Sequence, residues 1–438
     1  MEDAIERERQ ALANFFQPQA RRFQLEGVIG YGAFGATFKL IEFSPEDPPM
    51  TPRNRKRKFR SITPQKIASS ISGAWQEVKR RRINSPGDAI RIFRRQPLSP
   101  ATPPSASVAS LSASGPDTPG TPGRTYRSLN PAPRRILRRL CLKRTIDEDG
   151  EDDLRSEIRT LRAINGSQHV IGLIAYRDDP EPVAAQLRVT TPWPRVGPIQ
   201  ETVLSGLAGP VVIMEYMENG TLARVAERLG RGTWQGPIPN RFLWAIYLCG
   251  IRACIATAYQ LGFDLEADPI LETIWPARQP VQLAHGDLHY NNIMFGDADP
   301  TIQEHSLIPI LKWIDFGAAH IHADEDGEGV ERNILDVSNM INCLITGTEP
   351  DADEMDVDEM DAVDLAPDMP GLDEELQDLI RRGRAVDFLD RPSLADMFFR
   401  TYQAVTNRNE AFYRNSGLRE SDDDIREFVQ TLIYNPDP

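Results

Sequence analysis

The stretch HGDLHYNNIMF, residues 285–295, sets two histidines, an aspartate and two asparagines within eight residues, directly before an apolar run. So many hydrogen-bonding groups are costly inside a core, which points to a functional role. The carboxylate of Asp287 can accept the proton of an attacking hydroxyl, and Asn292 can offer an oxygen to a metal ion. For His285 and His289, taken singly, structural hydrogen bonding is favoured over catalysis.

A second carboxylate follows another strand-like run, ILKWI, and stands in the tetrapeptide Ile314-Asp315-Phe316-Gly317. Magnesium takes oxygen ligands from one or two residues together with phosphate oxygens. Asp315 and Asn292 supply those two oxygens if the strands that carry them lie side by side. The pattern therefore predicts a magnesium–phosphate site at this point.

A glycine-rich stretch lies near the start of the chain, with Gly30, Gly32 and Gly35 inside FQLEGVIGYGAFGATFKLIEF, residues 23–43. The GxGxxG pattern alone is a weak signal, and a plain hairpin turn is the alternative. Strands are predicted on both sides, whereas the dinucleotide fingerprint needs a helix directly afterwards. A glycine loop between two strands can cover a triphosphate, because its backbone N–H groups approach without intervening side chains.

Lys143 ends a predicted strand at 134–146, and Glu157 stands in a predicted helix at 152–164. Taken alone, the lysine is most simply a solvated strand end. Paired with Glu157, its ammonium can bridge phosphate oxygens while the carboxylate fixes its position. Strand alternation directs the neighbouring Arg144 to the opposite face. The helix itself is predicted from apolar residues at helical spacing, namely Leu154, Ile158, Leu161 and Ile164.

Taken together, the glycine loop, strand lysine, helix glutamate, MEYMENG at 214–220, HGDLHYNN and IDFG resemble, in order, the motifs of the protein kinase-like superfamily. The resemblance covers roughly 22–43 and 134–405. It implies an α+β, bilobal protein kinase-like fold, with a small antiparallel sheet plus one helix in one lobe and a larger, mainly helical second lobe.

The resemblance implies a nucleotide site with ATP and Mg²⁺ as cofactors. The three glycines would cover the phosphates, and Lys143 would hold them and pair with Glu157. Asp287 resembles the catalytic base, while Asn292 and Asp315 resemble the metal ligands.

Further residues resemble parts of the same fold. Met214 resembles the gatekeeper before a hinge, where backbone groups of Glu215 and Met217 would meet adenine. Asp336, in DVSNMINCLITG, resembles a buried aspartate that braces the catalytic loop. Arg391, in DRPSLADMF, resembles the late arginine of the helical lobe.

Three features depart from the usual kinase pattern. Gly286 stands where an arginine usually reads a phosphorylated loop, so regulation of that kind is not expected. His289 replaces a lysine, and HGDLH is similar to the aminoglycoside and choline phosphotransferases. The stretch from Gly317 to Asp336 is short and carries no APE-like motif.

MEYMENGTL and DRPSLADMF nevertheless resemble ordinary protein kinases. The sequence therefore predicts a divergent phosphotransferase with protein Ser/Thr as acceptor. The alternatives are a small-molecule kinase of the aminoglycoside or choline type, and a pseudokinase that acts as a scaffold.

The resemblance to protein kinases implies one kinase-like domain that is interrupted by two inserts and extended at both ends. The Pro/Ser/Arg-rich insert has eight Ser-Pro or Thr-Pro steps and is predicted to be disordered apart from a short helix at 66–83. The second insert is acidic and predicted to stay solvated. The prediction is a helical extension at 1–21, a kinase-like domain at 22–405 and a C-terminal extension at 406–438. Within the kinase-like domain, the first lobe is 22–220 with the insert 44–133, and the second lobe is 221–405 with the insert 349–378.

Composition limits partners and compartment. A formal net charge of −14 argues against general nucleic-acid binding. The apolar stretch 242–263 has Arg252 at its centre, which favours a buried helix over a membrane span. The protein is predicted to be intracellular and soluble, in the cytoplasm or nucleus. Basic tracts at 53–58 and 79–82 are either import signals or solvating charges.

The four cysteines are far apart or lie in apolar helical patterns, and none forms a CxxC pair. Buried thiols in a reducing compartment are therefore favoured over disulfides or zinc ligands.

Overall fold

The computed structural model describes residues 2–32, 35–44, 135–147, 149–178, 204, 206–261, 268–322, 328–348 and 371–435. The chain divides into two units, and all of these residues belong to the unit formed by 1–55 and 135–438. The first predicted insert except Ser44, the helix at 66–83 and both basic tracts lie outside the described residues, as do residues 349–370 of the acidic insert.

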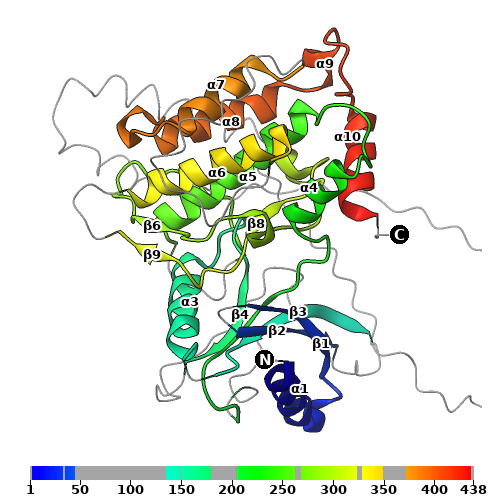
Figure 1. The fold of residues 1–438 in the computed structure, drawn as a ribbon, viewed down its shortest axis with the longest axis vertical. Helices are drawn as coiled ribbons and strands as arrows, with labels where there is room; N and C mark the ends of the chain where they lie inside the picture. The colour runs from blue at the N-terminus through cyan, green and yellow to red at the C-terminus, as the bar shows by residue number, and fades with distance from the viewer. Residues whose placement is uncertain are drawn as a thin grey trace, which may run out of the picture. The chain divides into compact units, whose positions relative to one another are not determined.

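The fold is mixed α+β and contains a five-stranded antiparallel sheet of order β1-β2-β3-β5-β4 (Figure 1). The strands predicted within 23–43 and at 134–146 are confirmed. The fifth strand, β4, follows the predicted helix and pairs with β5 at the end of the sheet. The bounds are β1 (Phe23–Gly32), β2 (Gly35–Phe43), β3 (Ile136–Arg144), β4 (Leu173–Arg177) and β5 (Val211–Glu215).

Two helices accompany this sheet. The N-terminal helix α1 (Glu2–Phe16) is confirmed, and it buries Leu12 and Phe16 in one hydrophobic cluster with sheet residues. A short 3-10 turn, η1 (Gln17–Gln19), joins it to β1. The predicted helix at 152–164 is α3 (Glu151–Ile164), and all four of its predicted apolar residues are buried.

The larger hydrophobic cluster centres on α5 (Asn240–Ala258), which contacts α6 (Gly329–Thr346) and α8 (Leu394–Asn407). By length and composition α5 could cross a membrane, but 94% of its apolar window is buried inside the protein. Arg252 is also buried there and bonds to both carboxylate oxygens of Glu304, at 2.8 and 2.7 Å. These contacts support the predicted buried helix. The other α-helices of the described residues are α4 (Leu222–Gly230), α7 (Glu374–Gly383), α9 (Glu410–Tyr413) and α10 (Asp422–Val429).

Two small antiparallel pairs position the predicted functional residues. β7 (Ile293–Phe295) pairs with β8 (Leu311–Trp313), so the strands that follow Asn292 and precede Asp315 do lie side by side. β6 (Leu283–Ala284) pairs with β9 (His320–Ile321), a pair too short to give a sequence signal. Short turns complete the chain: the 3-10 turns η5 (Tyr290–Asn292), η6 (Gln303–His305) and η8 (Phe388–Asp390), and the π-helical turn η9 (Gln430–Tyr434).

The acidic insert was predicted to stay solvated as far as residue 378, and its last part is instead ordered. Helix α7 begins at Glu374, and the Asp373 side chain caps it by accepting bonds from the backbone N–H groups of Glu375 and Leu376. Leu376 is fully buried. Acidic residues at a helix N-terminus interact favourably with the helix dipole, which explains why the charge run becomes helical here.

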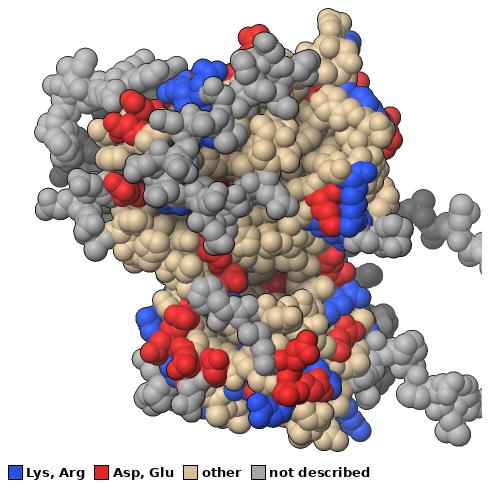
Figure 2. All heavy atoms as spheres, viewed as in Figure 1, with Lys and Arg blue, Asp and Glu red and all other residues tan. Residues whose placement is uncertain are grey.

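Acidic and basic side chains of the described residues are interspersed over the face shown in Figure 2. Among the described residues, several exposed ion pairs form within one helix, such as Arg426 with Asp423 on α10. Pairs of this kind contribute little to stability individually. The described part of this face therefore presents no single large area of one sign.

Candidate functional site

Lys143 is the centre of the predicted site. It lies on β3 with its side chain only 8% exposed, and its Nζ is 2.8 Å from Glu157 Oε2 and 2.7 Å from Asp315 Oδ1. Burial alone would lower the pKa of Lys143, but the two carboxylates outweigh it and raise the pKa above its ordinary value. Arg144 points the opposite way, as predicted, and bonds to Glu8 and to the Ala208 carbonyl.

Asp315 follows β8 with a backbone φ of +59°, the left-handed region that non-glycine residues seldom occupy. Its carboxylate accepts from Lys143 and, at 3.4 Å, from the backbone N–H of Gly317. Burial would raise its pKa, but the Lys143 ammonium more than compensates and keeps the pKa below its usual value. Such strain persists where surrounding contacts fix a functional geometry.

Asp287 and Asn292 are joined directly. The Asn292 amide nitrogen donates to the Asp287 carbonyl at 2.8 Å and to its Oδ2 at 3.0 Å. The backbone carbonyl of Asn292 accepts from the backbone N–H of Ile314, the residue before Asp315, at 2.9 Å. Side-chain contacts thus join Lys143 to Asp315 and Asp287 to Asn292, and a backbone hydrogen bond between Ile314 and Asn292 links the two pairs. Because the amide nitrogen is used, the amide oxygen is the atom that Asn292 can offer to a cation.

The two histidines of this stretch differ in environment. His285 is fully buried; its Nε2 donates to the Ile314 carbonyl at 3.0 Å, and its Nδ1 accepts from the backbone N–H of Asp287. Burial lowers the pKa of His285 to about 4, so it is a neutral, structural imidazole. His289 instead lies beside the predicted base, with its Nε2 3.5 Å from Asp287 Oδ2.

The helix that braces this segment uses a different residue from the one predicted. On α6, Asn333 accepts from the backbone N–H of His285 at 2.9 Å and donates to the Leu283 carbonyl at 2.8 Å. Asp336, the predicted brace, instead pairs with Arg332 at 3.0 Å, one turn away on the same helix. Sequence reasoning missed Asn333 because a carboxylate was expected.

The glycine loop is only partly described, since residues 33 and 34 are outside the described residues. Gly32 pairs with Gly35 across the hairpin, and the Gly30 carbonyl accepts from Thr37 Oγ1 at 3.1 Å. Gly35 has a φ of +121°, and a Cβ there would lie 2.2 Å from the Arg144 carbonyl oxygen. Close packing against β3 thus requires this glycine whether or not a ligand binds.

The predicted hinge begins at the end of β5. Met214 is buried and pairs with Cys141 on β3 and Leu173 on β4, while Met217 is also buried. Glu215 donates its backbone N–H to Gly172 and uses its carboxylate to accept from Gly172 and Lys312. Its N–H is therefore committed within the protein, and the contact of Glu215 and Met217 backbone groups with adenine stays a prediction.

No protein-family model matches the chain. A search of curated proteins likewise finds no significant match. Any assignment of function therefore depends on the geometry of the residues themselves.

Proposed function

We propose that the protein has a bilobal, kinase-like arrangement and transfers the γ-phosphoryl group of ATP to a hydroxyl in a magnesium-dependent reaction. In this proposal the five-stranded sheet with α3 forms the smaller lobe, and the helices around α5 form the larger. The observation that carries the proposal is the Lys143 ammonium, which is held between Glu157 and Asp315. The bonded pair Asp287–Asn292 is linked to this group by the backbone hydrogen bond from Ile314, the residue before Asp315.

The donor set fits a magnesium nucleotide. Asp315 offers a carboxylate oxygen and Asn292 an amide oxygen, the hard ligands that magnesium prefers. Bound Mg²⁺ would neutralise negative charge on the phosphate oxygens. Lys143 is already desolvated and charged, so it can exchange part of its contact with Asp315 for a phosphate while Glu157 keeps it in place.

Asp287 is suited to receive the acceptor's proton. Asn292 holds its Oδ2, which orients the carboxylate, and the side chain is 41% exposed. A hydroxyl could therefore approach the other oxygen from solvent. His289, at the position where protein kinases usually carry a lysine, lies beside the same carboxylate.

Protein Ser/Thr is the acceptor that we favour, because MEYMENGTL and DRPSLADMF resemble protein kinases. A small-molecule hydroxyl is the second candidate. The observation favouring it is the HGDLH stretch: His289 contacts the Asp287–Asn292 pair, and Gly286 has no side chain that could read a phosphorylated loop.

The first experiment measures phosphoryl transfer. Purified full-length protein is incubated with γ-labelled ATP, Mg²⁺ and a cell extract split into protein and metabolite fractions. Label in proteins supports the favoured acceptor, and label in metabolites supports the second candidate. Asp315→Ala should lower transfer by about a thousandfold or more, because a metal ligand is lost. Equal transfer by variant and parent would remove Asp315 from the site.

Lys143→Met tests phosphate alignment but leaves the buried Glu157 without its cation, which costs about 3–5 kcal/mol of stability. The double variant Lys143→Met/Glu157→Gln removes both charges and separates lost alignment from lost folding. Lys39→Met is the matched control, since Lys39 lies on the neighbouring strand β2 and pairs with Glu26. Nucleotide binding by the parent protein with no transfer to any fraction would favour the pseudokinase alternative.

A further inference from the structure

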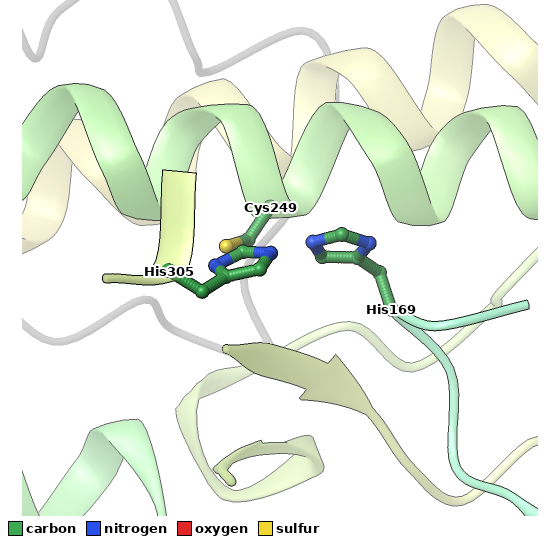
Figure 3. Close-up of side chains that lie close together, drawn as sticks. All are labelled: His169, Cys249 and His305. Carbon is green, nitrogen blue, oxygen red and sulfur yellow. The ribbon is translucent and has the colours of Figure 1, made fainter. Parts of the chain in front are cut away.

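Three metal-binding side chains converge away from the site described above. They come from the α3–β4 connection, helix α5 and turn η6, and are His169, Cys249 and His305 (Figure 3). Their ligand atoms all lie within 4.8 Å of one another, and all three residues are buried. The sequence separates them widely, so no spacing pattern could have revealed them.

Three of the four imidazole nitrogens in this cluster lack hydrogen-bond partners among the described residues. Among the described residues, neither ring nitrogen of His305 makes a hydrogen bond, and neither does Nε2 of His169. His169 is 0% exposed and His305 is 2% exposed. Buried polar atoms are nearly always paired, because leaving water without a new partner has a large free-energy cost. One unpaired nitrogen from each imidazole, beside one sulfur, is the chemistry of a ligand set.

The orientation of the His169 ring is fixed by Glu272. Glu272 accepts from its Nδ1 at 2.7 Å and from its backbone N–H at 2.8 Å. The ring is thereby held with Nε2 as the remaining nitrogen. A carboxylate bonded to the far nitrogen of an imidazole is the arrangement that metal-ligating histidines usually show. The backbone of Leu311 also hydrogen-bonds the Cys249 sulfur.

The surrounding charges favour a cation. Glu272 is a buried carboxylate that is held at the cluster by the ring and the backbone N–H of His169. Arg252 faces Glu304 and the Glu272 carbonyl, and Lys312 is neutralised by Glu215. One guanidinium against two carboxylates leaves one net negative charge. A divalent ion bound to one thiolate brings one net positive charge, which balances it.

We propose that His169, Cys249 and His305 bind one thiophilic divalent transition-metal ion of the Zn²⁺ type. Zinc bonds of about 2.0–2.3 Å place ligand atoms about 3.3–3.8 Å apart, so small side-chain rotations inward from the observed separations complete the site. Three protein ligands leave a fourth position for water. Imidazole and thiolate together exclude magnesium and calcium, which take oxygen ligands.

The expected effect of this ion is structural. His169 accepts from the backbone N–H of Trp313 at 3.0 Å, and Trp313 accepts in turn from Ile171 at 2.9 Å. The ion would therefore fasten the α3–β4 connection to α5 and to the β7–β8 connection. Because metal binding of this kind favours the folded state, its loss should lower thermal stability. This inference does not depend on the proposed phosphotransfer.

Cobalt provides a direct test. Full-length protein without a histidine tag is freed of metal with a chelator and titrated with Co²⁺. We expect saturation near one equivalent, with a thiolate-to-cobalt charge-transfer band that Zn²⁺ abolishes. Cys249→Ser and His305→Gln should remove the band. The matched control is Cys254→Ser, which alters another fully buried cysteine of α5 and should keep it.

A second readout uses the parent protein alone. Zn²⁺ added to the metal-free chain should raise the unfolding midpoint by about 5 °C or more at saturating metal. The nitrogens of His320 and His322 lie 3.1 Å apart, so this histidine pair could compete for added metal. The variant His320→Gln/His322→Gln removes the pair and should not change the charge-transfer band. No band with the parent protein, or an unchanged band in Cys249→Ser, would overturn the proposal.

Discussion

Gly286 has a backbone φ of +81°, and a Cβ at this position would lie 2.3 Å from the carbonyl oxygen of Ala318. The sequence showed only that glycine replaces the arginine usual in protein kinases. The structure adds a steric reason: the chain before Asp287 passes so close to the segment after Asp315 that no side chain fits. At the residue scale, this glycine sets the distance between two halves of the candidate site.

Gly286→Ala should therefore be more damaging than an alanine at another left-handed glycine. Gly347, at the end of α6, is a matched control, because its φ is +72° and nothing lies within 4 Å of an added Cβ. Gly347→Ala should cost about 1 kcal/mol from backbone strain alone. Gly286→Ala should cost about 1–3 kcal/mol more from overpacking.

Urea unfolding of the two glycine variants provides the measurement. Equal losses of unfolding free energy would mean that the Ala318 segment moves aside without penalty. In that case the close approach would not position Asp287, and activity of Gly286→Ala should stay near that of the parent protein.

Residue-scale prediction from sequence succeeded where alternation decides the outcome. Lys143 and Arg144 are adjacent, and strand alternation correctly directed the arginine to the other face. The contact of Lys143 with Glu157 was expected from the kinase-like resemblance, and the structure contains it. The contact of His289 with Asp287 was not predicted, because the sequence around a single histidine does not indicate which side chains lie beside it in the fold. The contact with Asp287 depends on how the turn η5 folds back.

At the scale of elements, helix α6 shows why a correct helix can be given the wrong functional residue. Asn333 and Asp336 are three residues apart, so they lie on one face of the helix. Sequence favoured the carboxylate, but the segment before β7 offers both a donor, the His285 N–H, and an acceptor, the Leu283 carbonyl. An amide satisfies both, whereas an ionised carboxylate can only accept.

Asp336 is left as a costly buried acid, and this predicts a pH dependence. Burial raises its pKa to about 6, which Arg332 only partly offsets, from an ordinary value near 3.8. Because the pKa of Asp336 is higher in the folded state than in the unfolded state, its contribution to stability is fully present below the ordinary pKa of 3.8. That contribution is lost as the pH rises through about 6, the folded-state pKa. Relative to Asp336→Asn, the unfolding free energy of the parent protein should fall by about 3 kcal/mol at most between pH 4 and 7.

Denaturant midpoints of parent and Asp336→Asn at pH 4, 5.5 and 7 test this sign. Asp423→Asn is the control, since its side chain is 95% exposed and no comparable pH-dependent difference is expected. A difference between parent and Asp336→Asn that stays constant over this range would show that Arg332 and Arg391 keep the buried carboxylate ionised.

Helices α5 and α7 show where the periodicity of apolar residues does not identify a helix. Helix α5 is buried on nearly all sides, so its identity came from the absence of a polar face rather than from a stripe. Helix α7 was hidden within a charge run, and only Leu376, Leu379 and Ile380 mark its apolar side. Tertiary burial decides both cases, and sequence pattern reports it only indirectly.

At the scale of the whole molecule, the long first insert leaves the sheet at a single point. Phe43 of β2 pairs with Ile136 of β3, and the backbone N–H of Ser44 donates to the Arg135 carbonyl at 2.9 Å. The two ends of residues 45–134 are therefore held together by the same ladder that aligns Lys143.

This junction predicts that residues 45–134 can be replaced by a four-residue Asn-Gly-containing turn without loss of the described fold. Shortening the loop lowers the entropy cost of joining β2 to β3, so the unfolding free energy should rise by about 2–3 kcal/mol. Urea unfolding and nucleotide turnover of the shortened chain provide the measurements. A fall in stability would mean that the insert contributes stabilising contacts. Unchanged stability with altered turnover would instead assign the insert a regulatory effect on the Lys143–Asp315 site, since β2 pairs directly with the strand that carries the lysine.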